Sequence, residues 1–442
     1  MKFGKRQLTR PLSAQLEITN GCNHKCIHCY LLSPYQENRP VVESSEETVL
    51  ACAQKLVDAG IFFCTVTGGE PMTNKNLMKK VIKLFVDNNV MVSVNTNITL
   101  LDDSIIQFLK DKNVGVLTSC PSSISGHYNK LTNTNNYSLF EDNLKKLTLA
   151  GIRYTVNMVV VKENLNDIVP TALRLAELGC KSFGATPASL NMDYPSPNFL
   201  LSLSDIRKFV YDLISIKKDI DMSIDIIEAL PKCCLPDDIL SGDYHFLNRK
   251  CLAGRLSVSV SSSGEVRPCG HNSISYGNLL VDSIESIYSM MQPWRNNEYI
   301  PDECKDCSWL NHCNGGCRTN AYAVHKNFKG RDIWMTQPIH SYVNQKTVVD
   351  DSNYKSLQLT VNQNYRYRKE YRDTYTIFNV KSRTYFMLNV EFLHFIKDVA
   401  QSFKDKIVTY NELVHYYNAE NNKYFDDILH LMYKKGLLMA SC

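Results

Sequence analysis

The first half of the chain alternates short apolar runs with longer stretches in which apolar residues recur every three or four positions. A short run is typical of a buried strand, and the longer period is typical of an amphipathic helix. This alternation predicts βα units and a parallel sheet. Six strand candidates lie at 15–19, 62–66, 91–95, 114–118, 154–160 and 182–186, and helix candidates include 45–59, 74–87 and 140–150.

Residues at the predicted helix ends agree with this reading. Ser44, with Glu47 three residues later, predicts a capping box. Gly60 and Gly151 stand where helices are expected to stop. Six right-handed βα units can curl into an α/β fold, a partial (β/α)6 version of the TIM-like barrel, whose chemistry lies in loops at the carboxyl ends of the strands.

The pattern changes twice along the rest of the chain. After about residue 220 there is little apolar periodicity, many turn residues and most of the remaining cysteines, which favours a region stapled by metal. The polar stretch 341–356 is a predicted linker. Strands at 375–379 and 384–388 and helices at 390–400, 410–417 and 425–435 then predict a small α+β domain. The predicted domains are 1–220, 221–345 and 346–442.

Composition excludes several classes of protein. Hydrophobic residues make up 44% and charged residues 21% of the 442 positions, and no apolar run is long enough to span a membrane. The N-terminus lacks a signal-peptide core, so we expect a cytoplasmic protein with no membrane partner. A net charge of +4 without a long basic run gives no support for a nucleic-acid partner. In the cytosol, the 16 cysteines favour metal binding or catalysis over disulfides.

Three cysteines, Cys22, Cys26 and Cys29, follow the first predicted strand with the spacing CxxxCxxC. Cysteine thiolates are the usual ligands of iron–sulfur clusters. Three of them around a four-iron cluster leave one iron open to a small molecule. A structural zinc ion needs four ligands, and His24 or His28 would complete such a site, so zinc is the alternative.

The next two strands end in residues suited to binding. The second ends in a TGGEP run, in which Gly68 and Gly69 allow the backbone to approach a ligand closely and Glu70 supplies a carboxylate. The third ends in polar residues that include Ser93 and Asn95.

The CNxxCxHCY loop, the GGEP turn and the polar strand ends together resemble the radical S-adenosylmethionine (SAM) enzymes over about residues 11–220. In that family the methionine part of SAM chelates the open iron of a [4Fe-4S] cluster, and reductive cleavage of SAM gives a 5′-deoxyadenosyl radical that abstracts hydrogen. The resemblance implies a flavodoxin or ferredoxin-type electron donor. It implies that Cys22, Cys26 and Cys29 hold the cluster, that Gly68, Gly69 and Glu70 face the amino group of SAM, and that Ser93, Asn95 and Ser119 hold the ribose.

A second group of cysteines begins with Cys251 and Cys269, and the pattern CxxC-x5-CxxxC follows. It resembles the SPASM extension of radical SAM enzymes, which holds two auxiliary iron–sulfur clusters and serves mainly peptide substrates. The resemblance implies three [4Fe-4S] clusters in all. For one of the two auxiliary clusters, [2Fe-2S] is the alternative. The implied ligands are Cys251, Cys269 and Cys317 for the nearer auxiliary cluster and Cys304, Cys307 and Cys313 for the farther one. A pair of zinc sites is the alternative.

Each auxiliary set has only three thiolates. His340 stands where the family has a final cysteine, and imidazole can replace thiolate on cluster iron, so His340 is the candidate fourth ligand of the farther cluster; a surface loop histidine is the alternative. At the nearer cluster Ser257 replaces a family cysteine, so either one iron is open or Cys233 or Cys234 binds it. The other cysteines are predicted to be buried and free: Cys52, Cys64, Cys120 and Cys180.

The strands and helices after residue 357 resemble the small winged-helix (PqqD-like) domain that recognises leader peptides in ribosomal peptide biosynthesis. Such domains bind a peptide as an added strand on a sheet edge. The alternatives are a DNA-binding winged helix and a packing domain, but no basic recognition helix is visible.

These resemblances imply a radical SAM/SPASM maturase that installs a carbon–carbon, ether or thioether crosslink in a ribosomally synthesised precursor peptide. No catalytic side chain beyond the cluster ligands is assigned. The alternatives are a peptide epimerase, for which Cys120 would be the hydrogen donor, and an anaerobic sulfatase (formylglycine) maturase. A different class of protein is also possible, an iron–sulfur sensor with a winged-helix DNA reader.

Overall fold

The computed structural model describes residues 8–30, 44–193, 197–242, 244–339, 351–370, 373–420 and 422–441. The chain forms two compact units. One is Pro11–Tyr342, and the other combines Met1–Arg10 with Val343–Cys442. The domain borders at 220 and 345 remain predictions from sequence. No helix in the described ranges is long and apolar enough to cross a membrane.

The larger unit is built on one nine-stranded sheet with the order β7-β6-β5-β4-β3-β2-β1-β8-β9. All neighbouring strands are parallel except β8 and β9. The six strands predicted from the sequence are confirmed within two residues at either end, but the expected sheet was too small, because β7, β8 and β9 extend it. The strands are β1 Ser13–Glu17, β2 Phe63–Thr67, β3 Met91–Thr96, β4 Gly115–Ser119, β5 Tyr154–Val160, β6 Ser182–Pro187, β7 Ser223–Ile226, β8 Ser257–Val260 and β9 Val266–Arg267.

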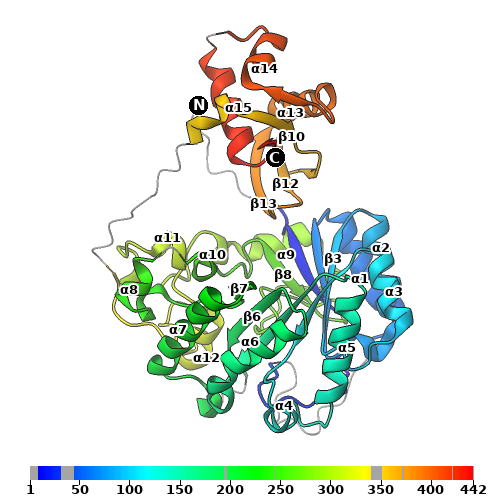
Figure 1. Ribbon diagram of the computed structural model, residues 1–442, viewed down its shortest axis with the longest axis vertical. Helices are drawn as coiled ribbons and strands as arrows, with labels where there is room; N and C mark the ends of the chain where they lie inside the picture. Colours follow the sequence, from blue (N-terminus) through cyan, green and yellow to red (C-terminus); the bar gives the residue numbers. More distant parts are fainter. Residues whose placement is uncertain are drawn as a thin grey trace. The chain divides into compact units, whose positions relative to one another are not determined.

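Helices cover the outer face of this sheet (Figure 1). They are α1 Glu46–Asp58, α2 Lys75–Asp87, α3 Asp103–Asp111, α4 Ser125–Thr132, α5 Tyr137–Leu149, α6 Ile168–Glu177 and α7 Leu203–Asp219. The predicted capping box at Ser44 is wrong, because α1 begins one residue later: Ser45 is the N-cap and accepts a hydrogen bond from the Thr48 backbone N–H at 3.2 Å. The predicted stops are confirmed, since Gly60 and Gly151 adopt positive φ after α1 and α5.

The register separates an apolar face of the sheet from a polar one. Leu16, Val66 and Val94 lie side by side on neighbouring strands and are fully buried. Residues one position away in each strand point to the opposite face. That face is mostly polar, with Leu117 and Val159 among its apolar exceptions, and carries Gln15, Glu17, Thr65, Thr67, Ser93, Asn95, Ser119, Asn157, Thr186 and Asp225. The parallel sheet is therefore a partial barrel with a polar interior.

The cysteine-rich region after β7 consists of short elements separated by turns. Its helices are η4 Lys232–Cys234, α8 Asp237–Leu240, η5 His245–Asn248, α9 Ile284–Met290, α10 Gln292–Arg295, η6 Asp302–Cys304, α11 Leu310–Cys313 and α12 Arg318–His325. This region is not separate from the barrel, because β8 pairs in parallel with β1, from Ser13 opposite Ser257 to Leu16 opposite Val260.

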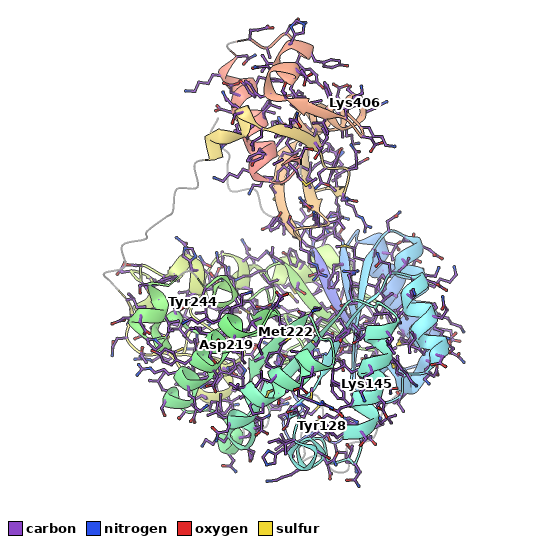
Figure 2. All side chains as sticks on the ribbon, viewed as in Figure 1. Tyr128, Lys145, Asp219, Met222, Tyr244 and Lys406 are labelled. Atoms are coloured by element: carbon purple, nitrogen blue, oxygen red, sulfur yellow. The ribbon has the colours of Figure 1, made fainter. Side chains whose placement is uncertain are left out.

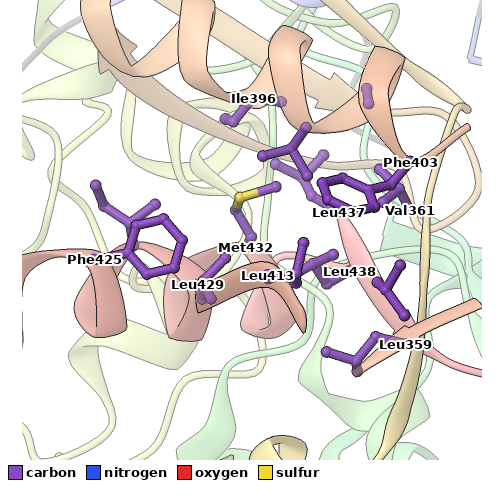
Figure 3. Close-up of a cluster of buried hydrophobic side chains, with 14 of the residues drawn as sticks. Leu359, Val361, Ile396, Phe403, Leu413, Phe425, Leu429, Met432, Leu437 and Leu438 are labelled. Carbon is purple, nitrogen blue, oxygen red and sulfur yellow. The ribbon is translucent and has the colours of Figure 1, made fainter. Parts of the chain in front are cut away.

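The smaller unit is α+β, as predicted. One antiparallel sheet joins β10 (Gln358–Val361) to β14 (Ile407–Thr409) and β15 (Leu438–Ala440). The other has the order β11 (Tyr365–Lys369), β12 (Thr374–Asn379), β13 (Thr384–Asn389). Helices α13 (Val390–Ser402), α14 (Tyr410–Tyr416) and α15 (Lys423–Lys434) close a core that Figure 3 shows, with Leu359, Ile396, Leu413, Leu429 and Met432 at its centre.

Residues from the start of the chain complete this smaller unit. The backbone N–H and the hydroxyl of Thr9 donate hydrogen bonds to the Glu370 carboxylate at 3.1 and 2.6 Å. Arg10 donates to the Lys369 carbonyl at 2.7 Å, and Arg368 donates to the Arg10 carbonyl at 3.0 Å. Pro11, the next residue, begins the larger unit.

Candidate active site

The CxxxCxxC loop leaves the carboxyl end of β1, where the sequence placed the active site. Cys22, Cys26 and Cys29 are all half-buried. The backbone N–H groups of Lys25 and Ile27 donate to the carbonyls at the end of α4, at 3.0 Å each. The loop between β1 and α1 is therefore tied to a helix far along the chain, and its three thiols are held in fixed positions.

Two other side chains of this loop anchor it. Asn23 donates to the Thr99 hydroxyl at 2.9 Å and accepts from the Asn97 side chain at 2.8 Å. His24 is buried beside the ring of Tyr128, which Figure 2 labels, and its Nε2 lies 3.4 Å from the Thr99 hydroxyl. Burial lowers the pKa of His24 to about 4, so the ring is neutral at pH 7.

The Gly68-Gly69 pair lies directly against this loop. Gly69 donates to the Thr19 carbonyl and Glu70 to the Gly21 carbonyl, both at 2.8 Å, so the β1–β2 pairing continues into the cysteine loop. A Cβ on Gly68 would overlap the Thr19 carbonyl, and one on Gly69 would overlap the Gly21 carbonyl. The sequence predicted that the glycines allow close approach to a ligand; in the structure the group they approach is the cysteine-loop backbone.

Glu70 is fully buried, and its carboxylate already has three donors. It accepts from the Met72 N–H at 2.9 Å, the Thr96 hydroxyl at 2.7 Å and the Asn97 N–H at 2.7 Å. Burial raises the pKa of Glu70, although these hydrogen bonds oppose the shift. The carboxylate thus ties the end of β2 to the end of β3.

The three residues expected at the ribose share the polar face of the sheet. Ser93 and Asn95 lie on β3, and Ser119 lies at the end of β4. The Oδ1 atom of Asn95 is buried and, within the described residues, has no hydrogen-bond partner. A buried acceptor without a donor is costly, so a polar ligand such as SAM fits this face. Asn157 of β5 pairs with Ser119 and was not singled out from sequence, although it is a polar residue within a predicted strand.

The residues expected at the nearer auxiliary cluster, Cys251, Cys269 and Cys317, lie near one another. Burial raises the pKa of Cys251 to about 12, and the adjacent Glu228 and Cys269 add to the shift. Burial also raises the pKa of Cys317, with contributions from Glu228 and Cys251. Glu228, which follows the end of β7 and which the sequence analysis missed, therefore lies near all three thiols. Burial raises the pKa of this carboxyl to about 7.

The farther group gathers Cys304, Cys307 and Cys313 around the short helices η6 and α11. Cys233 joins this group and not the nearer one, where the sequence analysis considered it. Its pKa is raised by burial and then by Cys313 and Cys307. The predicted ligand His340 lies outside the described residues. Cys52, Cys64, Cys120 and Cys180 are buried and free, as predicted.

Tyr30 connects the two groups of cysteines. It ends the CxxxCxxCY run, and its ring lies 4.1 Å from the ring of His271, between centroids. A Cβ on Gly270, next to Cys269, would lie 3.0 Å from the Tyr30 ring. The Tyr30 carbonyl also accepts from the Asn191 side chain at 2.7 Å.

The arrangement of the thiols bears on the choice between zinc and iron–sulfur clusters. Ligands of one zinc ion all lie about 2.3 Å or less from it, so they touch each other. Ligands of a four-iron cluster bind different irons and lie farther apart. Among the described residues, no group of three or more His, Cys, Asp or Glu side chains is close enough to hold a single ion. The described residues thus show no preassembled site for a single ion, and the choice between zinc and clusters rests on the comparison with known proteins.

Comparison with known proteins favours iron–sulfur clusters. Residues 16–175 match the radical SAM superfamily, and residues 251–308 match an iron–sulfur cluster-binding (SPASM) domain. These matches imply SAM and iron–sulfur clusters as cofactors.

The relatives include peptide maturases. The chain is 29% identical over 336 residues to the antilisterial bacteriocin subtilosin biosynthesis protein AlbA of Bacillus subtilis, covering 71% of this chain and 68% of AlbA. It is 25% identical to the AdoMet-dependent heme synthase of Methanosarcina barkeri (70% and 91% covered) and 24% identical to the PqqA peptide cyclase of Bradyrhizobium diazoefficiens (71% and 83% covered).

A solved structure shows the same fold. SuiB of Streptococcus suis, bound to S-adenosylmethionine, superposes with a TM-score of 0.59 at 18% identity, covering 74% of this chain and 77% of SuiB. The partial barrel, the cysteine loop at its carboxyl edge and the two family matches lead to one conclusion: this chain combines a radical SAM domain with a SPASM domain and is similar to AlbA and the PqqA peptide cyclase.

Proposed function

We propose that this enzyme installs a crosslink, carbon–carbon, ether or thioether, in a ribosomally synthesised precursor peptide. The observation that carries the proposal is that one chain joins a barrel with the SAM-type cysteine loop to a separate α+β unit with an open sheet edge. The names of AlbA and the PqqA peptide cyclase describe work on peptides, which supports a peptide substrate here.

In the barrel, Cys22, Cys26 and Cys29 would hold the SAM-binding cluster. When bound, this cofactor supplies the electron that cleaves SAM and so allows hydrogen abstraction from the substrate. The backbone of Gly68 and Gly69 keeps the loop in place, and Asn95 offers an unpaired acceptor on the polar face. Ser93 and Ser119 lie on the same face for the ribose.

Two auxiliary clusters would occupy the cysteine-rich region. Cys251, Cys269 and Cys317 would hold the nearer one, beside Glu228, and Cys304, Cys307 and Cys313 would bind the farther one. Coupling of two side chains removes two hydrogens from the peptide, one as an atom and one as a proton with an electron left over. A redox centre near the substrate suits that requirement. A flavodoxin or ferredoxin-type protein would be the external electron donor.

The α+β unit offers β13 for the leader of the peptide. In the described part of this unit, β13 pairs with β12 on one side only. The opposite edge strand, β11, is different, since Thr9 and Arg10 bind at its end. An extended peptide can pair with an unpaired edge through main-chain hydrogen bonds. We therefore place the leader along β13, with the half-buried Tyr385 and Met387 on one face of that strand and Phe386 on the other.

The test is anaerobic reconstitution with SAM, a reductant and the precursor peptide. Crosslinking predicts 5′-deoxyadenosine and a peptide lighter by two hydrogens per crosslink, both absent in Cys26→Ala. A peptide of unchanged composition that takes up deuterium from solvent would instead indicate epimerisation. A peptide in which a cysteine or serine becomes formylglycine would indicate sulfatase-type maturation. Failure of the intact protein to form 5′-deoxyadenosine would refute the radical mechanism.

A further inference from the structure

The farther auxiliary group has three thiols close together in sequence, Cys304, Cys307 and Cys313, and needs a fourth ligand to close a four-iron cluster. The sequence pattern pointed downstream, to His340. The structure instead brings a thiol from upstream. Cys233 lies on η4, a single turn of 3-10 helix that follows β7 and precedes Cys251 and the later cysteines.

Packing places η4 against the group. Cys233 and Leu310 pack on a small buried cluster made of Ile300, Cys304 and Met335. The Cys304 thiol lies 3.9 Å from the Met335 sulfur. The Lys232 N–H, one residue before Cys233, points at the Cys313 sulfur at 3.4 Å. Two of the three thiols therefore border the turn that carries Cys233.

Hydrogen bonds fix the orientation of the Cys233 side chain. The Thr336 N–H donates to the Cys233 sulfur at 3.3 Å, and the Thr336 hydroxyl donates to the Cys233 carbonyl. Backbone N–H groups directed at ligand sulfurs are one of the ways in which a protein tunes an iron–sulfur cluster. Met335 and Thr336, which lead toward residue 340, thus act by holding Cys233.

Electrostatics agree with the packing. The buried Cys304 and Cys313 and the half-buried Cys233 and Cys307 would each bring a thiolate to this group. Several thiolates in one buried place are costly without a compensating positive charge. Bound iron provides that charge. Cys234 is also fully buried, but its neighbour on the chain, Cys233, is the one that Thr336 and the Ile300–Cys304–Met335 cluster contact.

We propose that Cys233 is the fourth ligand of the farther auxiliary cluster, which is then held by Cys233, Cys304, Cys307 and Cys313 with no need for His340. The inference rests on the proposed function only in requiring that the protein holds this cluster. Four thiolates also predict a lower reduction potential than ligation by an imidazole would give.

The experiment compares Cys233→Ala with Cys234→Ala, its buried neighbour, in the full chain purified anaerobically. Both are made in a Cys22→Ala/Cys26→Ala/Cys29→Ala background, which removes the SAM-site cluster so that the auxiliary clusters are seen alone. Iron and sulfide content, Mössbauer spectra and electron paramagnetic resonance are measured. Cys233→Ala should either lose one iron and show a three-iron signal when oxidised or lose the farther cluster entirely, whereas Cys234→Ala should match the background.

Cys233→Ser guards against misfolding of the alanine variant, because the hydroxyl keeps the size of the side chain and can bind iron. It should retain the iron but shift the midpoint potential of one auxiliary cluster. Wild-type iron, spectra and potential in all Cys233 variants would overturn the proposal, and so would a three-iron signal in His340→Ala or Cys234→Ala. Intact cluster spectra in a protein that makes no crosslink would contradict the proposed function and leave the ligand assignment standing.

Discussion

Single residues fix the position of the cysteine loop by very close contacts. Gly68 and Gly69 lie where no side chain fits, because the backbone of Thr19 and Gly21 occupies the space in which a Cβ would stand. Glu70 then locks the same turn to β3 through three donors. The loop that carries Cys22 is thus positioned by backbone pairing before any cofactor binds.

Gly69→Ala should therefore displace the loop. We expect lower iron content at the SAM site and 5′-deoxyadenosine formation reduced roughly tenfold or more, equivalent to at least about 1.4 kcal/mol in the barrier. Gly126→Ala is the matched control, because nothing lies within 4 Å of the Cβ that it adds. Equal iron content and turnover in the two variants would contradict the role assigned to Gly69.

Glu70→Gln tests the second contact. In wild type each carboxylate oxygen of Glu70 accepts from a backbone N–H. The glutamine replaces one of these oxygens by an NH2 group, which cannot accept, so one buried N–H is left unpaired. The expected cost is about 1–3 kcal/mol of unfolding free energy, measured by urea denaturation. A Glu70→Gln protein as stable as wild type would show that the three hydrogen bonds contribute little.

At the scale of elements, β1 lies between two different partners. On one side β2 brings the GGEP turn, and on the other β8 brings the cysteine-rich region. Arg267 of β9 forms an ion pair with Glu17 of β1, with side-chain exposures of 14% and 3%. The region that carries the auxiliary cysteines therefore stabilises β1, the strand that leads into the cysteine loop, through the β1–β8 pairing and the Glu17–Arg267 ion pair.

Arg267→Met should leave the Glu17 carboxylate buried without its partner. Loss of one member of a buried pair costs about 3–5 kcal/mol, so the melting temperature of the barrel should fall clearly. Lys83→Met removes an ion pair whose members are 63% and 44% exposed and should change stability by less than about 1 kcal/mol. Calorimetry of the two variants side by side would decide; similar shifts would rule out a structural role for the Glu17–Arg267 pair.

The sequence predicted elements well where the information is local. The six strands and most helices follow from alternation and helical period, and the CxxxCxxC and GGEP motifs marked their own loops. The sequence did not show that β8 joins the barrel or that Cys233 lies beside Cys304 and Cys313, because those neighbours are distant along the chain. The sequence analysis missed Glu228 for the same reason, because only folding brings this residue close to three thiols.

At the scale of the whole molecule, the smaller unit depends on one buried carboxylate. Glu370 is 1% exposed and pairs with Arg368, which is 6% exposed. It also accepts from the Thr9 and Thr376 hydroxyls. Burial pushes the pKa of Glu370 upward, but Arg368 and these hydroxyls outweigh burial and hold the pKa below its usual value of 4.5.

This shift predicts how acid affects the unit. A carboxyl whose pKa is lowered in the folded state stabilises the protein above its unfolded pKa, and the contribution disappears as the pH falls through the folded value. Leader affinity and stability of the smaller unit should therefore be constant near neutral pH and decline below about pH 4.5. Glu370→Gln should weaken leader binding at pH 7 and flatten the acid dependence; a variant that keeps the full acid transition would contradict this assignment.

Removal of residues 1–10 should act on the same unit. Thr9 and Arg10 supply hydrogen bonds to Glu370 and Lys369, so the truncated enzyme should bind the leader more weakly while 5′-deoxyadenosine formation without peptide is unchanged. Thr9→Ala is the milder version, with an expected loss of about 1 kcal/mol. Isothermal titration with the leader peptide measures both. Unchanged affinity in the truncation would show that the contact is dispensable.

The composite origin of this unit also limits how it can be exchanged between enzymes. A chimera that takes only residues 343–442 would lack Thr9, whose backbone N–H and hydroxyl bind Glu370. The host enzyme would keep its own N-terminal segment without the domain that this segment contacts. An exchange between enzymes should therefore transfer both ends of the chain, residues 1–10 and 343–442, as one unit. The barrel between them in the sequence can then stay unchanged.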